Sequence, residues 1–280
     1  MAKNFEVIML ASGSKGNAAL ISTENRRFLV DVGISCRELS KRLKSVGVAA
    51  EDIDYVFLTH EHIDHIRGLS TFMKKYSVPV FASYKTWLAI FSRDSTIERA
   101  KCNIIDKSFL AGGVRVDSFP VPHDAVDTRG FVFTAQGSGA KCTYVTDVGF
   151  VTPLVREAAE GSTELVLEAN HDIEMLRNGP YPYLLKQRIA GGAGHLSNIG
   201  AASMLAAMER LPAHVFLAHL SQHNNRPELA YATAADLLDS VHRLGETEII
   251  IASQDEVVTD NRLRQQDIFA AEMQGKPLFK

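Results

Sequence analysis

Four side chains that can bind a metal ion lie within six consecutive residues of the segment THEHIDHIRG, residues 59–68. They are His60, His62, Asp64 and His65. In an extended segment alternate side chains share a face, so His60 and His62 can point at one ion. Asp64 and His65 are adjacent, and after a turn of the chain they can reach a second ion nearby. Neither site would be complete, because a catalytic ion typically takes about three protein ligands and keeps a position for water.

The missing ligands are predicted at three positions where an apolar, strand-like run ends in a loop. His123 follows SFPVP, Asp147 follows CTYVT and His219 follows HVFLA. Strand ends along one edge of a sheet can converge on one cleft, so we expect these side chains to meet the histidine motif. The expected assignment is one ion on His60, His62 and His123, a second ion on Asp64, His65 and His219, and Asp147 as a bridge between them.

The ligand types indicate the chemistry. Five imidazoles and two carboxylates favour zinc, manganese or iron over magnesium or calcium, which prefer sites built of oxygen atoms. Two such divalent ions lower the pKa of a bound water to about 7 and hold the attacking and leaving oxygens of an ester. Their charge exceeds that of two carboxylates and one hydroxide, which suits an anionic phosphate ester. The alternative, surface or core histidines without metal, fits a lone histidine better than this spaced set.

The composition of the 280 residues is that of a globular protein, with 46% hydrophobic and 22% charged residues. The formal net charge of −3 excludes a generally basic surface for nucleic acid, although a local basic patch is compatible with it. The first residues lack the long apolar core of a signal peptide, and no apolar run reaches the about 18 residues of a membrane span. Three cysteines without CxxC spacing indicate reduced thiols. We therefore expect a cytoplasmic protein with no membrane association.

The elements that must position these side chains alternate along the chain. Short apolar runs bounded by turn residues predict strands in 5–11, 18–33, 53–60, 77–83, 112–123, 128–137, 140–149, 163–171, 213–221 and 247–253. Helical spacing predicts helices in 36–47, 86–91, 154–161, 198–211 and 226–244. No linker, repeat or low-complexity segment interrupts them, so a single domain over 1–280 is expected. The order of elements favours two β-sheets between layers of helices.

The HxHxDH motif and the later ligands resemble those of the metallo-β-lactamase superfamily, and the resemblance covers most of the chain. It implies an α/β (α+β) fold, an αβ/βα four-layer sandwich with the site at one sheet edge. Asp31 in FLVDVG matches an early Asp of that superfamily, which implies a structural role near the site rather than a ligand. Binuclear lactamases commonly carry a cysteine where this chain has Asp147, which argues against antibiotic hydrolysis. Flavodiiron relatives carry a glutamate where this chain has His62, which argues against redox chemistry.

Five separated segments narrow the resemblance to the YycJ/WalJ (VicX) group: LASGSKGNAALI, LEANHD, YPYLLKQRI, GHLSN and LAHLSQHNN. Members of that group are regarded as DNA-processing exonucleases with a two-metal centre, which implies a DNA substrate here. GHLSN, the alanine-rich helix after it and LAHLS also resemble the transfer-RNA 3′-processing enzymes (tRNase Z). That likeness implies that His219 binds the metal and that His195 serves the phosphate or a proton transfer.

The segment GGAGHLSNIG around His195 is a second group of candidates. Ser197 or Asn198 is expected to cap the following helix, and a helix N-terminus beside a histidine is a suitable seat for a phosphate. A plain glycine loop with a cap is the alternative. Glu168 at the end of a predicted strand could orient His195, as carboxylates commonly orient imidazoles, or it could face solvent.

Two loops supply candidates for substrate binding. SGSKGN offers backbone N–H groups, Lys15 and Asn17 to a phosphate, although a bare hairpin loop is the commoner meaning of such a sequence. SQHNNRP follows His219 directly, so His223, Asn224 and Asn225 are expected at the rim of the cleft.

The remaining candidates have weaker signals. Lys186 and Arg188 in YLLKQR form a small basic patch that could track a DNA backbone, or they form a solvated helix face. His171 is open between a functional and a structural role. His214 and His242 are expected at the surface, and Trp87 and Phe91, four residues apart, in the core under a helix.

Together these observations predict a two-metal hydrolase of phosphodiester bonds, with a DNA exonuclease as the main hypothesis. Asp64 would orient the nucleophile, and His195 would protonate the leaving oxygen or bind a non-bridging one. The substrate-binding set is Lys15, Asn17, His195, Ser197, Asn224 and Asn225. The alternatives are a small-molecule phosphodiesterase, a glyoxalase-II-like (thio)ester hydrolase, an RNA-processing nuclease and a regulatory protein with a vestigial site. Protein partners stay open.

Overall fold

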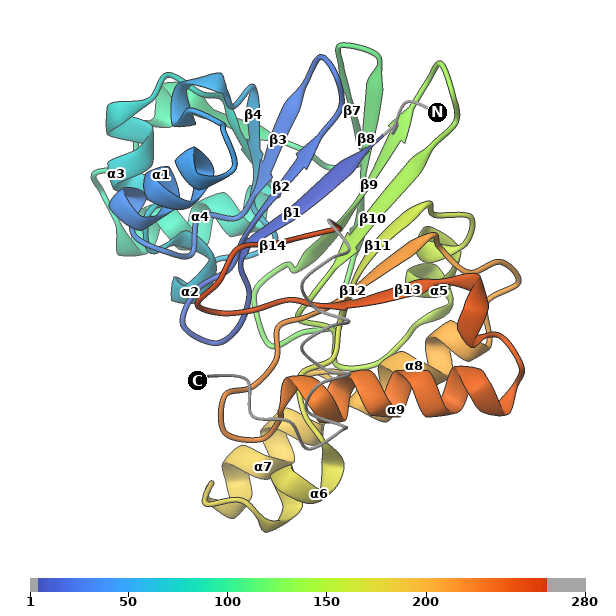
Figure 1. Cartoon of the computed structure of the whole chain (residues 1–280). Coiled ribbons are helices and arrows are strands. Elements are labelled where there is room, and N and C mark those ends of the chain that lie inside the picture. Colours follow the sequence, from blue (N-terminus) through green and yellow to red (C-terminus); the bar gives the residue numbers. More distant parts are fainter. Residues whose placement is uncertain (1–4, 261–280) are drawn as a thin grey trace, which may run out of the picture.

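Two seven-stranded sheets form the centre of the computed structural model, which describes residues 5–260 (Figure 1). The first sheet has the order β14-β1-β2-β3-β4-β5-β6. Its strands are β1 (Glu6–Ala11), β2 (Ala18–Ser22), β3 (Arg27–Val30), β4 (Tyr55–Phe57), β5 (Val80–Ala82), β6 (Cys102–Ile104) and β14 (Val258–Thr259). The second sheet has the order β13-β12-β11-β10-β9-β8-β7. Its strands are β7 (Ser108–Ala111), β8 (Val114–Pro120), β9 (Arg129–Ala135), β10 (Lys141–Val145), β11 (Glu164–Glu168), β12 (His214–Ala218) and β13 (Glu248–Ile251).

Helices cover the outer face of each sheet (Figure 1). The first sheet is covered by α1 (Cys36–Ser45), α3 (Leu69–Lys75) and α4 (Tyr84–Arg93), and the second by α5 (Pro153–Ala159), α8 (Asn198–Ala206) and α9 (Pro227–Ser240). The short α2 (Ile63–Ile66) follows β4, and α6 (Ile173–Asn178) and α7 (Tyr183–Ala190) form a pair that projects beyond α8 and α9. The predicted sandwich of two sheets between helices is therefore confirmed.

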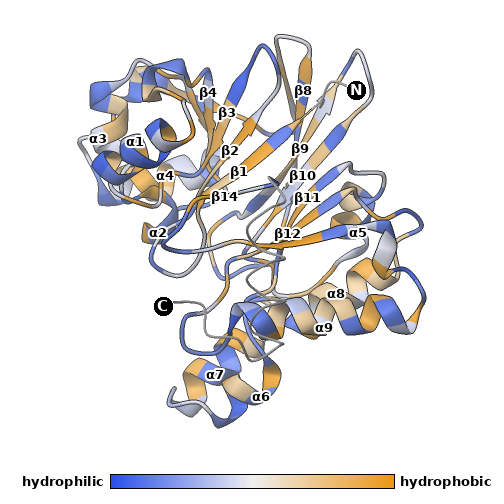
Figure 2. Ribbon diagram, in the orientation of Figure 1, coloured by the Kyte–Doolittle hydropathy of each residue, from blue (hydrophilic) through white to orange (hydrophobic). Residues whose placement is uncertain are grey.

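The central strands β1, β2, β11 and β12 are buried on both faces, which explains why they appear in the sequence as continuous apolar runs. Along β1 the side chains of Val7 and Met9 lie in the core between the two sheets, whereas those of Ile8 and Leu10 lie under the helices. This is the alternation that a strand requires. The apolar residues follow the strands and the inward faces of the helices (Figure 2).

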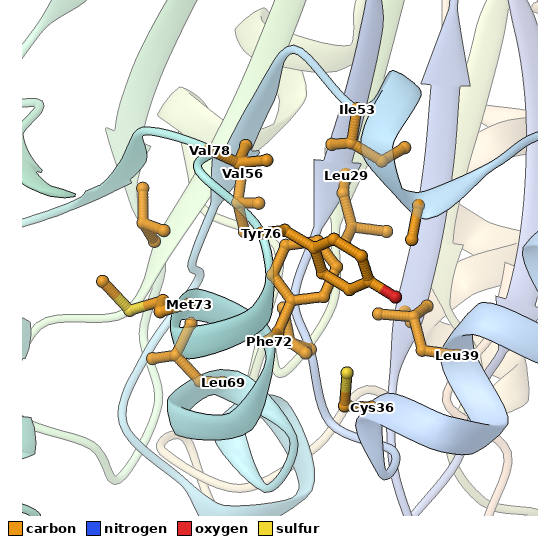
Figure 3. Close-up of a cluster of buried hydrophobic side chains, with 14 of the residues drawn as sticks. Leu29, Cys36, Leu39, Ile53, Val56, Leu69, Phe72, Met73, Tyr76 and Val78 are labelled. Carbon is orange, nitrogen blue, oxygen red and sulfur yellow. The ribbon is translucent and has the colours of Figure 1, made fainter. Parts of the chain in front are cut away.

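Aromatic rings fill the core between the sheets. Phe28 of the first sheet contacts Phe133 of the second with ring centroids 5.3 Å apart, and Phe57 contacts Phe131 at 5.4 Å. The core under α1 and α3 is built differently, from aliphatic side chains around Phe72 and Tyr76 (Figure 3). These rigid layers hold the strand ends at which the predicted site residues lie.

The structure differs from the sequence-based expectation at short elements. The sequence does not predict β6, β7, β14, α2, α3 and α6, because segments of two to seven residues carry too little periodicity. Trp87 is buried and stacks on Phe91 at 5.5 Å, as expected of a helix core.

The prediction that His214 lies at the surface is wrong. His214 begins β12 and is buried beside its register partner Glu164 on β11, whose carboxylate lies 2.9 Å from His214 Nδ1. This hydrogen bond raises the pKa of His214. The sequence at the first residue of a strand does not show whether a polar side chain there is exposed or is buried with an oppositely charged partner. His242 is exposed, as predicted.

Three further properties bear on the sequence-based expectations. Cys36, Cys102 and Cys142 all have free thiols. Within residues 5–260, no helix combines the length and the apolar character needed to cross a bilayer. The single domain over 1–280 stays a prediction, and residues 1–4 and 261–280 lie outside the described part of the chain.

Candidate metal centre

Seven side chains predicted as metal ligands lie together at one end of the two sheets. They come from loops that directly follow strands of both sheets: His60 after β4, His123 after β8, Asp147 after β10 and His219 after β12. The loop after β4 also carries the other three, since His62 caps α2 and α2 contains Asp64 and His65. Their donor atoms form groups within 4.8 Å of one another.

The first group is His60, His62 and His123. The ring centroids of His60 and His62 lie 4.5 Å apart, and those of His60 and His123 lie 5.1 Å apart. His62 and His123 are separated by 5.2 Å, so the three rings surround a common point. Three imidazoles in this arrangement form a nitrogen-rich site of the kind that zinc and other transition ions accept.

The second group is Asp64, His65 and His219. One oxygen of Asp64, Oδ2, lies 3.6 Å from both His65 Nε2 and His219 Nε2. Asp147 lies between the two groups: its Oδ2 is 3.3 Å from His65 Nε2 and its Oδ1 is 3.7 Å from His123 Nε2. Asp147 is thus placed where a carboxylate could bridge two cations.

The buried polar atoms of the two groups lack partners of their own. His60 Nε2, His123 Nε2, His219 Nε2 and Asp147 Oδ2 have no hydrogen-bond partner among the described residues. Burial of polar atoms without partners is costly, and native structures contain few of them. Four such atoms facing one small volume, on side chains that are standard metal ligands, fit divalent cations. The His/Asp clusters are therefore suited to metal binding.

The buried carboxylate of Asp31 contacts the second group on the side of His65 that faces away from Asp64 and Asp147. Asp31 Oδ2 accepts a hydrogen bond from His65 Nδ1 at 2.7 Å, which turns His65 Nε2 toward Asp64 and Asp147. The backbone N–H of Thr59 donates to Asp31 Oδ1 at 2.8 Å, and the Thr59 hydroxyl lies 3.0 Å from His60 Nδ1. Because its oxygens are occupied in this way, Asp31 orients a ligand rather than serving as one.

Glu168, at the end of β11, has the same role on the other side. Its Oε1 accepts from His195 Nδ1 and from His219 Nδ1, both at 2.8 Å. Its Oε2 accepts the backbone N–H groups of Val148 at 2.8 Å and Leu196 at 3.0 Å. The side chain is fully buried, so the alternative of a solvent-facing Glu168 is wrong. It fixes the two imidazoles instead of binding an ion itself.

Burial and charge divide the histidines into two classes. Burial lowers the pKa of His60 well below its usual value and also lowers that of His62, so both are neutral and ready to bind a cation. Burial opposes the charged form of His65 too, but the carboxylates of Asp147, Asp31 and Asp64 outweigh it and raise the pKa of His65 to about 9. Because a metal ligand must be deprotonated, a cation at the second group displaces a proton.

Three backbone positions beside the site have unusual conformations. Asp31, Asp147 and His219 have φ values of 63°, 56° and 58°, in the left-handed region. For residues other than glycine this conformation costs about 1–3 kcal/mol, and it persists where surrounding structure enforces it. Each of these residues lies within two positions of a strand end, so the bent backbone turns the carboxylate or imidazole back toward the cluster.

His195 and Ser197 lie where the sequence predicts. His195 lies beside the cluster, with its ring centroid 5.0 Å from that of His123 and 5.1 Å from that of His219. Its side chain keeps 22% of its surface exposed, more than those of its neighbours His123 and His219. Ser197 caps α8, since its hydroxyl accepts from the N–H of Gly200 at 3.1 Å. The structure thus contains the capped helix after the glycine loop and also a histidine that a carboxylate holds in one orientation.

The structure corrects the expected positions of Asn224 and Asn225, which were predicted at the rim of the cleft but are buried. Asn17, predicted to offer its side chain to a phosphate, is buried as well. The Asn17 amide lies 3.2 Å from His65 Nε2 and donates to the carbonyl of Gly13 at 3.1 Å, and the Asn225 amide donates to the carbonyls of Ala169 and Asn170. Polar loops of this kind turn inward where backbone carbonyls need donors. His223 is exposed.

The basic candidates Lys15, Lys186 and Arg188 differ in whether their side chains already have partners. Lys15 is exposed, and its carbonyl accepts from Arg67 Nη1 at 2.7 Å. Lys186 donates to the carbonyl of Arg177 at 2.8 Å. Arg188 forms an ion pair with Asp124, the residue after His123, so its charge is partly neutralised.

Two groups near the ligands were not predicted from the sequence. Thr59 links Asp31 to His60, and the carbonyl of Gly194 lies 3.0 Å from His123 Nδ1. Thr59 directly precedes the HxHxDH motif, so its position in the sequence could have indicated that it supports the ligands. A backbone carbonyl that orients a histidine has no sequence signal at all.

Comparisons with known proteins agree with this geometry. A family profile described as "Beta-lactamase superfamily domain" matches residues 26–220. The chain is 36% identical over 236 residues to a protein of Bacillus anthracis named Exodeoxyribonuclease YycJ, covering 82% of this chain and 88% of that protein. It is 35% identical over 239 residues to Exodeoxyribonuclease WalJ of Streptococcus pneumoniae serotype 2, covering 84% and 88%.

A solved structure shows the same fold at lower identity. The metallo-β-lactamase fold protein YhfI from Bacillus subtilis superimposes with a TM-score of 0.67 at 18% identity, over 92% of this chain and all of that one. The family profile and the two relatives each cover more than two thirds of the chain. The chain therefore belongs to the β-lactamase superfamily, in the same family as YycJ and WalJ.

Proposed function

We propose that this protein is a metal-dependent phosphodiesterase that uses two divalent ions to hydrolyse DNA from an end. The observation that carries the proposal is the set of buried, unpartnered donor atoms from four strand-end loops, at His60, His123, His219 and Asp147. The names of YycJ and WalJ, both exodeoxyribonucleases, support DNA as the substrate and cleavage from an end. The three free thiols support a reducing compartment such as the cytoplasm.

The ligand groups suggest how two ions would be held. His60, His62 and His123 would hold the first ion, Asp64, His65 and His219 the second, and Asp147 would bridge them. This nitrogen-rich set favours zinc, manganese or iron. When bound, such a pair supplies a water nucleophile at neutral pH and neutralises charge on the phosphoryl oxygens.

Two side chains of the protein carry the proton and orientation steps. Asp64 keeps 19% of its side chain exposed, so one carboxylate oxygen can accept a hydrogen bond from the attacking water and orient it. His195 donates its Nδ1 hydrogen to Glu168, which leaves Nε2 available to the substrate. Glu168 outweighs the effect of burial and raises the pKa of His195, so this imidazole can donate to the leaving oxygen.

The test removes one ligand from each ion. His62→Ala and Asp64→Ala should each lower the hydrolysis of end-labelled DNA to background while the circular dichroism spectrum stays that of the parent. His242→Asn is the matched control, because His242 is an exposed histidine whose left-handed backbone asparagine tolerates. Near-normal rates in either ligand variant would contradict the proposal.

The same assay separates the rival substrates. Single- and double-stranded DNA and RNA, each labelled at one end, distinguish a DNA exonuclease from an RNA-processing enzyme and report the direction of cleavage. Bis(p-nitrophenyl) phosphate, a small diester, and a thioester substrate test the small-molecule alternatives. Hydrolysis of a small ester with no action on any polynucleotide would favour those alternatives.

A further inference from the structure

A groove adjoins the metal centre on the side of His195. It has a volume of about 670 Å³, and its walls come from the loop after Asp147 and from α5, α6, α7 and α8. His195 belongs both to the groove and to the surroundings of the ligand cluster. Small-molecule pockets have volumes of about 300–1,000 Å³, so the groove is of a size for one unit of a polymer rather than a double helix.

Exposed apolar side chains gather at this groove. Phe150, Tyr183 and Ile173 line it, with 51%, 71% and 49% of their surfaces exposed. Single exposed apolar residues are common on protein surfaces, but a group that lines one concavity marks a binding surface. Two of the three are aromatic and lie on different segments, one in the loop after β10 and one in α7. Rings of this kind are platforms on which a planar base can stack.

The charged side chains of the groove all have the same sign. Arg156, Arg177 and Lys186 line it, and no carboxylate of the described residues does. Arg156 has no ion pair within residues 5–260, whereas Arg177 lies 3.6 Å from Glu174. These three basic side chains lie beside the apolar wall of the groove. Such a groove suits a ligand that combines a negatively charged phosphate with a planar, apolar group.

The inner wall carries a polar atom that nothing in the described part of the protein satisfies. His171 lines the groove with only 3% of its surface exposed, and its Nδ1 has no hydrogen-bond partner among the described residues. Burial lowers the pKa of His171 to about 4, so the ring is neutral at pH 7 and can act as donor or acceptor. A ligand edge with hydrogen-bonding groups would satisfy it.

We propose that this groove binds the terminal nucleotide of a DNA strand, with its base against Phe150 and Tyr183 and its scissile phosphate at the metal centre. This inference rests on the proposed function and adds the subsite for the terminal base. A base inside a duplex is covered on both faces by its neighbours, whereas the terminal base of a strand has a free face that can stack on these rings.

The test compares two single-stranded oligonucleotides that differ only in the terminal base, one natural and one abasic, with the modification placed at each end in turn. The parent protein should hydrolyse the natural end with a kcat/KM about tenfold or more above that of the abasic end, from the usual strength of stacking on an aromatic side chain. The double variant Phe150→Ala, Tyr183→Ala should lose this preference. Tyr84→Ala, which removes an exposed tyrosine on α4 that does not line the groove, should keep it.

A binding measurement makes the result independent of catalysis. Deoxyadenosine monophosphate should bind to the parent protein in calorimetry, and the affinity should fall about tenfold or more in the double variant but not in Tyr84→Ala. Equal rates on natural and abasic ends, a preference that survives in the double variant, or absence of nucleotide binding would each overturn the inference. If the parent binds the nucleotide but hydrolyses neither DNA nor bis(p-nitrophenyl) phosphate when loaded with metal, the proposed function fails and the groove assignment stands.

Discussion

At the residue scale, the site depends on carboxylates that bind no cation themselves. Asp31 and Glu168 are both fully buried, and each hydrogen-bonds the Nδ1 of an imidazole, Asp31 that of His65 and Glu168 that of His195 and His219. In each case the bond selects the tautomer and directs Nε2 away from the carboxylate. Partners of this kind commonly change metal affinity by about 10–100-fold when they are replaced.

Asp31→Asn keeps the shape of the side chain but removes its charge. We expect the affinity of the second ion to fall by about 10–100-fold, because the proton on His65 Nδ1 loses a charged acceptor, while the fold is retained. Titration of the metal-free protein with zinc or manganese measures this. Asp54→Asn is the control, since Asp54 pairs with Arg26 away from the site. An unchanged affinity in Asp31→Asn would show that the buried carboxylate does not act on the ligand.

The sequence predicts ligands better than it predicts their surroundings. His60 to His65 could be identified because three histidines and an aspartate at this spacing are typical of a metal site, and His123, Asp147 and His219 because each follows an apolar strand. The inward orientation of Asn225 could not be predicted, since it depends on carbonyls of residues more than fifty positions away. The partners of Glu168 are also far away along the chain, since Val148, His195 and His219 lie 20, 27 and 51 positions from it.

At the element scale, close contacts between backbone segments hold the HxHxDH motif in place, and the short helix α2 within it contributes less. The N–H of Asn17 donates to the carbonyl of Asp64 at 2.8 Å, and the N–H of Gly33 donates to the carbonyl of Asn17 at 2.8 Å. Gly33 lies so near that a Cβ atom there would come 1.7 Å from the Asp64 carbonyl oxygen. Strand positions could be predicted from apolar runs, whereas this contact between loops could not.

Gly33→Ala should therefore damage the site through the backbone. We expect a loss of at least about 1–3 kcal/mol in the free energy of unfolding, as for other overpacked positions, together with weaker binding of the second ion as Asp64 is displaced. Chemical denaturation and metal titration give the two values. Gly137→Ala is the matched control, because a Cβ there meets nothing within 4 Å. Equal stability of the two variants would mean that the loops can separate without cost.

At the scale of the whole molecule, the two sheets each supply part of the ligand set. His60 to His65 follow β4 of the first sheet, and His123, Asp147 and His219 follow strands of the second. The cations would therefore join the two halves of the sandwich, and binding to the folded state alone stabilises it by mass action. The sandwich could be predicted from the order of elements, but which strand ends meet depends on the packing of the two sheets through rings such as Phe28 and Phe133.

The most direct test of a two-ion centre is the number of metal ions bound per chain, measured by elemental analysis after loading and removal of excess metal. The parent protein should bind two divalent ions, His123→Ala should retain one, and His219→Ala should retain one. His242→Asn, as control, should retain two. A parent protein that binds no tightly held ion, or two ions retained in both ligand variants, would contradict the assignment of these seven side chains to two cations.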